Sequence, residues 1–304
     1  MYVIGVDIGG TNLKVGLISN MLIDKEVVPT NSFDLVKQII NTIDLILSRN
    51  DLSHENLLGI GVGCPGIVDN GVVVESINLN LRDFSIKEHL ESYFNCDVIV
   101  KNDGDMATLG EHKYGAGENV PNMLMLTIGT GIGGGVIINN QLLQGNRGCG
   151  EFGHINLIKN GIPCNCGRLG CFEKYASYTA LLNMVKDNLK DYPNSTLRNI
   201  ENLNAQIIYN EYKNGDGCAT FVIEEYTDYL KEGILDYCNI FKPDKIVVGG
   251  GISYVSEIIN IVKEKCKKEF FGYRNSSEVD IVPAKLQNDS GMLGAKTCFD
   301  NKSV

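Results

Sequence analysis

Two glycine-rich segments contain residue types suited to binding phosphate groups. The first reads Asp7-Ile8-Gly9-Gly10-Thr11-Asn12, and the second, residues 127–135, contains five glycines. Glycine lets a backbone approach a phosphate closely. The Thr11 hydroxyl can donate a hydrogen bond, and the Asp7 carboxylate can hold Mg²⁺ directly or through water. Either segment alone is also typical of an ordinary hairpin, so neither identifies a nucleotide site by itself.

A third glycine segment, Gly249-Gly250-Gly251, follows the apolar run 246–248. Small residues between a strand end and a helix can form a flat slot for an adenine ring or a ribose. A glycine cap at the start of a helix is the simpler interpretation of this segment taken alone.

Three cysteines, Cys164, Cys166 and Cys171, lie within eight residues, and His154 lies ten residues upstream of the first. Three thiolates and one imidazole form an established tetrahedral zinc set, and four protein ligands leave no open position for catalysis. The alternative is a group of reduced cysteines without a metal. Clustered cysteines in a chain without an export signal favour a structural zinc ion.

Asp103 stands between a predicted strand and a predicted helix, directly after Asn102. A carboxylate in this place can accept the proton of a substrate hydroxyl, which phosphoryl transfer requires to orient the nucleophile. The alternative is that Asn102 and Asp103 only cap the helix. Asp105 is a second candidate base by residue type.

The elements that must position these residues alternate between strand and helix. Apolar runs predict strands at 3–8, 13–18, 23–28, 57–62, 98–101, 123–128, 136–138 and 245–248. Helical spacing predicts helices at 32–49 with Ser32 as N-cap, from 103 to 113, and at 176–190, 202–213, 219–241, 255–268 and 290–299. This alternation predicts an α/β fold.

Residues 3–18 and 123–138 share the order strand, glycine turn, strand, with Gly9 opposite Gly129 at an offset of 120 residues. This pattern predicts two related halves, although glycine hairpins resemble one another in general. We expect an N-terminal domain at 1–117 and a C-terminal domain at 118–288, which contains the zinc segment 154–171. The C-terminal helix, 289–304, is expected to pack back on the first domain.

The net charge of −10 opposes binding to nucleic acids and anionic membranes. A phosphate ligand is still compatible with this charge, because backbone N–H groups can bind it. No apolar run approaches the ~20 residues that cross a bilayer. The N-terminus lacks the pattern of a signal peptide, so we expect a cytoplasmic protein.

Taken together, these segments resemble the ROK family (repressor, open reading frame, kinase) of sugar kinases and sugar-responsive repressors. The similarity extends along nearly the whole chain. Its most specific part is Glu151-Phe152-Gly153-His154 followed by the three cysteines, and further parts are the run 107–111, Glu173 and the three glycine segments.

The resemblance implies an actin-like, ribonuclease-H-like ATPase fold, with two α/β domains around a cleft. It implies homodimers or larger homo-oligomers, and ATP with Mg²⁺ bound by Asp7, Gly9, Gly10, Thr11, Asn12, Lys14, Thr130, Gly131, Gly133, Gly250 and Gly251. It implies a sugar bound by Gly66, Asn78, Asn102, Asp103, Glu151, His154 and Glu173, with Asp103 as the catalytic base. The implied zinc ligands are His154, Cys164, Cys166 and Cys171, so that His154 serves both sites.

The implied activity is transfer of the ATP γ-phosphate to the 6-hydroxyl of a hexose, with glucose as the first choice. N-acetylmannosamine and N-acetylglucosamine are close alternatives and a β-glucoside is a further one, because the sequence does not give the volume around C1 and C2 of the sugar. An alternative of another class is a sugar-sensing regulator. Regulators of the family carry a DNA-binding domain before the core, whereas here Asp7 comes almost at once.

Overall fold

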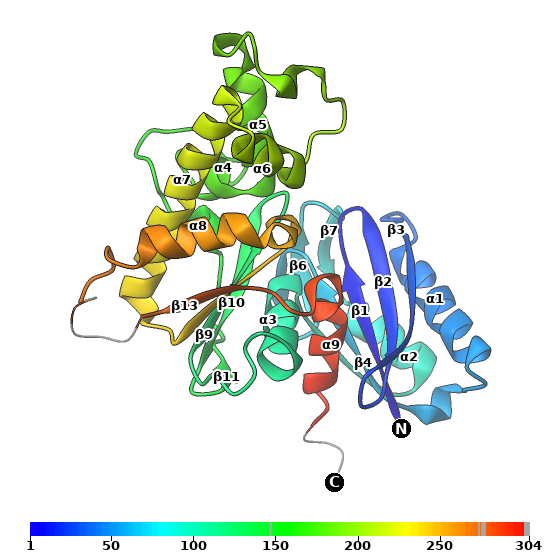
Figure 1. Cartoon of the computed structure of the whole chain (residues 1–304). Coiled ribbons are helices and arrows are strands. Elements are labelled where there is room, and N and C mark those ends of the chain that lie inside the picture. Colours follow the sequence, from blue (N-terminus) through cyan, green and yellow to red (C-terminus); the bar gives the residue numbers. More distant parts are fainter. Residues whose placement is uncertain (146–147, 273, 275–277, 301–304) are drawn as a thin grey trace. The chain divides into compact units, whose positions relative to one another are not determined.

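The computed structural model of the protein describes residues 1–145, 148–272, 274 and 278–300 (Figure 1). Two five-stranded sheets form its framework, and the predicted α/β class is confirmed. The first sheet has the order β3-β2-β1-β4-β8. Its strands are β1 (Tyr2–Ile8), β2 (Asn12–Ile18), β3 (Leu22–Pro29), β4 (Leu57–Cys64) and β8 (Asp97–Asn102). β1 pairs antiparallel with β2 and parallel with β4, and β4 pairs parallel with β8.

The second sheet has the order β11-β10-β9-β12-β13, with β12 parallel to β9 and β13. Its strands are β9 (Met123–Ile128), β10 (Ile132–Ile138), β11 (Gln141–Leu142), β12 (Lys245–Gly249) and β13 (Asp280–Pro283). Each sheet therefore places its first three strands from the centre to one edge and the last two on the other side. This shared order agrees with the repeat predicted from the glycine hairpins.

The chain forms two compact units. One comprises residues 1–119, 135–150 and 288–304, and the other comprises residues 120–134 and 151–287. The last four residues of the predicted C-terminal helix, 301–304, lie outside the described residues. The domain boundaries expected from the sequence remain a prediction.

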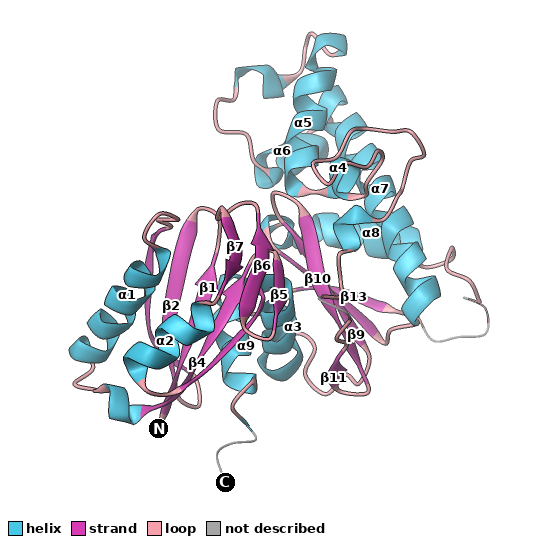
Figure 2. Ribbon diagram, turned by 180° about the vertical axis from the view of Figure 1, so that it is seen from behind, coloured by secondary structure: helices cyan, strands magenta, loops and turns pink. Residues whose placement is uncertain are grey.

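Helices cover both faces of the first sheet. Figure 2 shows α1 (Leu35–Arg49) and α2 (Ile86–Phe94) on one face, where Ile39 and Ile43 are buried with Val6 of β1. The other face carries α3 (Asp103–Tyr114) and α9 (Ser290–Thr297), which lie side by side in Figure 1. Successive strand residues point to opposite faces. Because Gly5 packs against Met292, Asp7 also points toward α9.

The helix α1 begins two residues later than predicted. Its N-cap is Asp34 and not Ser32. The Asn31 side chain accepts a hydrogen bond from the backbone N–H of Phe33 at 3.2 Å, which favours a turn over a helix at these residues.

The second unit contains α4 (Glu173–Ala176), α5 (Tyr178–Asn188), α6 (Ala205–Lys213), α7 (Gly217–Phe241) and α8 (Ser256–Cys266). The predicted helix 176–190 corresponds to α5, which begins two residues later because Ser177 has extended backbone angles and ends α4, a short helix that was not predicted. The Ser177 side chain then accepts a hydrogen bond from the N–H of Ala180 and caps α5.

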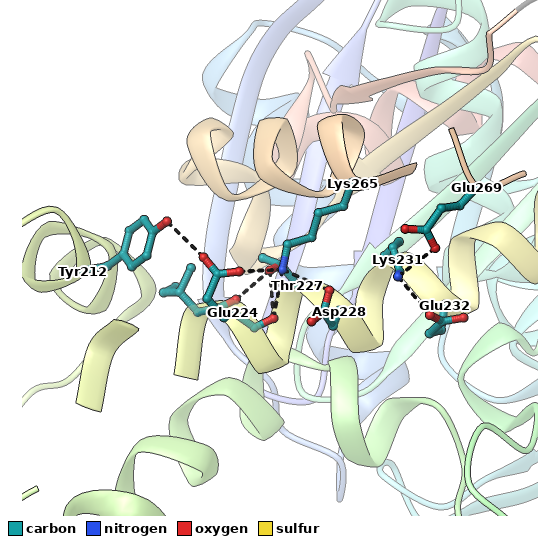
Figure 3. A network of polar contacts seen from close by, with 9 residues as sticks. Tyr212, Glu224, Thr227, Asp228, Lys231, Glu232, Lys265 and Glu269 are labelled. Atoms are coloured by element: carbon teal, nitrogen blue, oxygen red, sulfur yellow. Dashed lines mark hydrogen bonds and ion pairs between the residues drawn. The ribbon is translucent and has the colours of Figure 1, made fainter. Parts of the chain in front are cut away.

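Ion pairs fix α8 on α7 (Figure 3). Lys265 Nζ lies 2.8 Å from Glu224 Oε2 and 3.0 Å from Asp228 Oδ1. One turn along, Lys231 Nζ lies 2.9 Å from Glu269 Oε2. The two pairs that share the Lys265 ammonium group hold the C-terminal end of α8 against α7.

A small third sheet was not predicted. Its strands are β5 (Ile67–Asp69), β6 (Val72–Ser76) and β7 (Leu81–Phe84). Short 3₁₀-helices complete the fold: η1 (His54–Asn56), η2 (Phe152–His154), η3 (Leu189–Asp191), η4 (Thr196–Asn199), η5 (Gly251–Tyr254) and η6 (Gln287–Asp289). Among the described helices, none combines the length and the apolar character needed to cross a bilayer.

Candidate functional site

The first glycine turn joins β1 and β2. The Gly9 N–H donates to the Asn12 carbonyl at 2.9 Å, and the Thr30 hydroxyl donates to the Gly9 carbonyl at 2.7 Å. The first bond closes the turn itself, and the second joins it to the residue that follows β3. Among the described residues, no atom lies within 4 Å of a Cβ placed on Gly10, so the fold itself leaves room for a side chain there.

Asp7 ends β1 and forms an ion pair with Lys14 of β2. Lys14 Nζ lies 2.8 Å from Asp7 Oδ2, in the register that places the two residues opposite each other. Both side chains are about one fifth exposed, at 17% for Asp7 and 22% for Lys14. A partly solvated carboxylate beside this glycine turn has the oxygen ligands that Mg²⁺ prefers.

The second glycine turn joins β9 and β10 and is shorter than predicted. The Gly129 N–H donates to the Gly131 carbonyl at 2.9 Å, and β10 starts at Ile132. Gly133, Gly134 and Gly135 therefore belong to the strand. A Cβ placed on Gly129 meets no atom within 4 Å among the described residues, as at Gly10.

The Gly249–Gly251 segment lies beside this second turn. β12 pairs parallel with β9, and Gly249 stands opposite Thr127, so both segments leave adjacent strands at their carboxyl ends. Ligands of open α/β sheets bind at such edges. Gly250 has φ +79° and packs directly on the backbone of Ile128. The structure thus brings Thr130 and Gly131 near Gly250 and Gly251.

The four predicted zinc ligands lie together in the second unit. The imidazole and thiol atoms of His154, Cys164, Cys166 and Cys171 all lie within 4.8 Å of one another. Cys166 Sγ lies 3.5 Å from Cys171 Sγ, and Cys164 Sγ lies 3.7 Å from His154 Nδ1. Zn–S bonds of about 2.3 Å in a tetrahedron separate ligand atoms by about 3.5–3.8 Å. The residues therefore fit a tetrahedral zinc ion, with Nδ1 as the imidazole ligand.

Glycines let the chain curl around this cluster. Gly167 and Gly170 have φ +88° and +76°, and the Cys164 N–H donates to the Arg168 carbonyl at 2.9 Å. Burial raises the pKa of the Cys164 thiol to about 12. The backbone N–H of Arg168 lowers the pKa of the exposed Cys166. A zinc ion replaces these thiol protons when it binds.

Two further predicted sugar-binding residues of this unit are Glu173, which contacts the cluster, and Glu151, which lies three residues before His154 in the chain. Glu173 begins α4, and its Oε1 accepts a hydrogen bond from Cys164 Sγ at 3.2 Å. Its Oε2 would lie 2.6 Å from a Cβ placed on Gly131, so the carboxylate touches the second glycine turn. Glu151 is exposed and precedes η2, which ends with His154. Glu173 thus lies between the zinc ligands and the turn.

The remaining predicted sugar-binding residues lie in the first unit. Asn102 caps α3 through its Oδ1, which accepts the Gly104 N–H at 2.8 Å, while its Nδ2 donates to the Gly66 carbonyl at 2.9 Å. Asp103 follows as the first residue of α3, and its Oδ1 accepts the same N–H at 2.9 Å. A helix N-terminus favours an ionised carboxylate. Asn78 is exposed between β6 and β7.

The capping interpretation of Asn102 and Asp103 is therefore correct, and the catalytic role of Asp103 stays a prediction. Cys64, at the end of β4, lies close enough for the Asp103 charge to act on it. Burial first, and then this charge, raise the pKa of the Cys64 thiol to about 12. Sequence reasoning missed the contact of Thr30 with Gly9 and the proximity of Cys64 to Asp103. Pairing of β2 with β3 brings the first pair together, and pairing of β4 with β8 places Cys64 opposite Asn102.

Comparisons with known proteins agree with this geometry. The ROK family model matches residues 3–302. A glucokinase of Halalkalibacterium halodurans is 34% identical over 96% of this chain and 93% of that protein. A xylose repressor of Bacillus spizizenii is 32% identical over 96% of this chain, which spans 75% of the repressor. The crystal structure of a ROK family glucokinase from Streptomyces griseus in complex with glucose and AMPPNP is 28% identical, with a TM-score of 0.85 over 98% of this chain and 99% of that chain.

The fold is thus the actin-like ATPase fold that was expected. The chain belongs to the ROK family, and the membership expected from its motifs is confirmed.

Proposed function

We propose that the chain is a cytoplasmic ATP-dependent kinase that transfers the γ-phosphate to the 6-hydroxyl of a hexose, with glucose as the preferred sugar. The observation that carries this proposal is the placement of Asp103 at the start of α3, where Asn102 holds the helix end to Gly66. The glucokinase relatives support the same activity. N-acetylmannosamine and N-acetylglucosamine remain the alternative substrates, and a homodimer or larger homo-oligomer remains a prediction.

In this proposal, the two glycine turns bind the ATP phosphates through backbone N–H groups, and the Gly249–Gly251 segment binds the adenosine. Mg²⁺ would bind near Asp7 and offset charge on the phosphates during transfer. The Lys14 ammonium group, paired with Asp7, adds a positive charge at the same turn. Backbone donors and cations that are in place before the reaction stabilise the transferring group without reorganisation.

The sugar would be bound by Gly66, Asn78, Asn102, Asp103, Glu151, His154 and Glu173. Asp103 would accept the proton of the 6-hydroxyl as its oxygen attacks the γ-phosphorus in line. The hydrogen bond from the Gly104 N–H to Oδ1 helps to orient the carboxylate. Asp105 lies two residues on in the same helix turn and is the rival base by residue type.

A zinc ion would hold His154 Nδ1 and fix which ring nitrogen faces the sugar. Other residues of the chain hold the segments around His154 in place. Cys164 and Cys171 are buried, and the Tyr237 hydroxyl donates to the Phe152 carbonyl at 2.6 Å within the Glu151–His154 segment. The imidazole Nε2 is left for a sugar hydroxyl.

Alanine substitutions at Gly129 and Gly250 distinguish a glycine needed for ligand binding from one needed for folding. We expect Gly129→Ala to leave the unfolding midpoint within about 2 °C of wild type, since the fold leaves room there. It should still raise the KM for ATP roughly tenfold, because a methyl group prevents close approach of phosphate. Thermal unfolding and steady-state kinetics check both values.

Gly250→Ala is the matched comparison. Its positive φ and its contact with Ile128 leave no room for a side chain. Strain of this kind costs about 1–3 kcal/mol, so this variant should unfold several degrees lower. An unchanged ATP KM in Gly129→Ala would remove the second turn from the proposed phosphate site.

An ADP-release assay with Mg-ATP tests the proposal against its rivals. The panel is glucose, mannose, fructose, N-acetylglucosamine, N-acetylmannosamine and cellobiose. We expect the highest kcat/KM with glucose. A higher value with an N-acetylhexosamine would replace glucose as the substrate, and a folded, zinc-loaded protein that is silent on every sugar would favour the regulator.

A further inference from the structure

Tyr178, the first residue of α5, contacts three separate segments of the second unit. Its backbone N–H donates to the Gly129 carbonyl at 3.0 Å. Its ring lies against Gly251, and its hydroxyl oxygen accepts the N–H of Ala205 at 3.2 Å. Two of these segments are the proposed phosphate turn and the proposed adenosine segment. No sequence motif pointed to this residue.

The bond to Gly129 affects which backbone groups of the second turn face a bound phosphate. A carbonyl oxygen directed at a phosphate group repels it, whereas N–H groups attract it. The Tyr178 N–H engages the Gly129 carbonyl and directs it toward α5. The capping of α5 by Ser177 holds this N–H in position, since Ser177 is itself buried.

The ring contact explains why residue 251 is glycine. A Cβ placed on Gly251 would lie 3.0, 3.3 and 3.4 Å from three ring carbons of Tyr178. Gly251 does not have the positive φ that Gly250 has, so its backbone conformation does not require glycine. The glycine instead allows the tyrosine ring to lie on the backbone of the adenosine segment.

The hydroxyl contact anchors the far end of the ring. Ala205 is the first residue of α6, whose N-cap Asn204 accepts the Ile207 N–H at 3.0 Å. The Tyr178 hydroxyl therefore satisfies one of the N–H groups that a helix start leaves open. Residue 178 is therefore held by its backbone N–H at the Gly129 carbonyl and by its hydroxyl at Ala205, with the ring packed on Gly251 between them, so the side chain can act as a rigid spacer.

We propose that Tyr178 is a positioning residue for the nucleotide: it sets the spacing between the Gly129–Gly131 turn and the Gly250–Gly251 segment, so that both engage one ATP molecule. This inference deepens the proposed kinase function and rests on it. A tyrosine that only packs α5 into the unit would change stability without selectively changing nucleotide affinity.

The test measures the Kd of the Mg²⁺ complex of AMPPNP by calorimetry, together with KM for ATP and for the sugar. Tyr178→Phe removes one hydrogen bond and should raise the nucleotide Kd about two- to tenfold. Tyr178→Ala removes the spacer and should raise it more than about tenfold. In both variants, sugar KM and zinc content should stay within about twofold of wild type.

Tyr226→Phe is the matched control. It removes a buried hydroxyl that donates to the Ala176 carbonyl at 3.0 Å within the same unit. Neither residue belongs to a glycine segment. We expect it to lower the unfolding midpoint without changing the nucleotide Kd. An equal rise of Kd in Tyr178→Phe and Tyr226→Phe would overturn the inference, as would an unchanged Kd in both Tyr178 variants.

Gly251→Ala tests the contact between the Tyr178 ring and Gly251 independently. It should weaken nucleotide binding when Tyr178 is present, and have a smaller effect in the Tyr178→Ala background, where the methyl group has space. Equal effects in both backgrounds would contradict the contact. If Tyr178→Ala does not fold, the Phe comparison decides. A wild-type protein that binds no nucleotide would overturn the proposed function and this inference together.

Discussion

Replacing Asp103 with asparagine should lower kcat for sugar phosphorylation by about 10²–10⁴-fold, the usual contribution of a general base. The variant should fold normally, because the asparagine oxygen can still accept the Gly104 N–H that now bonds Asp103 Oδ1. Asparagine also keeps the size of the side chain. Binding of sugar and of nucleotide should therefore change much less than kcat.

Steady-state kinetics and calorimetric sugar binding measure the two effects separately. Asp105→Asn is the control, since Asp105 lies in the same helix turn and is the rival base by residue type. We expect its kcat to stay within about tenfold of wild type, because it acts on Asp103 only through charge. If turnover survives in Asp103→Asn and is lost in Asp105→Asn, the two roles are exchanged.

Removal of zinc should have the second-largest effect. Cys166→Ser, or a chelator acting on the wild-type protein, should reduce bound zinc from about one ion per chain to nearly none. The unfolding midpoint should fall by about 10 °C or more, because a structural zinc ion contributes several kcal/mol to folding. Sugar KM should rise roughly tenfold as His154 loses its anchor.

Metal analysis, thermal unfolding and kinetics check these three values on the same samples. Cys96→Ser is the control, because Cys96 is a half-buried thiol of the first unit, outside the ligand cluster. It should keep its zinc and its sugar KM. If Cys166→Ser retains a full equivalent of zinc, Cys166 is not a ligand and the four-residue set is wrong.

Local patterns in the sequence were enough to predict the strands of both large sheets that carry the glycine turns. β1, β2, β9 and β12 are short, nearly continuous apolar runs, as expected for strands buried on both faces. The glycine pattern repeated after 120 residues also anticipated the common strand order of the two sheets. Each of these features depends on neighbouring residues in the chain.

Elements without such a pattern were missed. β5 and β7 have three and four residues and no fully buried side chain, so they lack the period-two alternation that marks a strand. The break between α4 and α5 occurs at Ser177. Apolar residues continue at helical spacing on both sides of it, so the sequence is compatible with one uninterrupted helix. The structure places Ser177 in an extended conformation instead.

The same distinction applies to the site. The zinc ligands lie close in sequence, so their spacing alone could suggest a cluster, and the structure brings all four together. Thr30 and Tyr178 contact the glycine turns across long stretches of chain. Contacts of this kind depend on strand pairing and helix placement, for which a single sequence contains no local pattern.

The most direct test of the central claim is to identify the product. Glucose incubated with Mg-ATP and the wild-type protein should give one sugar phosphate, whose phosphorus couples to the C6 protons in a two-dimensional ³¹P–¹H spectrum. The Asp103→Asn protein should give almost none in the same time. A phosphate on another carbon, or ADP formed without any sugar phosphate, would contradict the account.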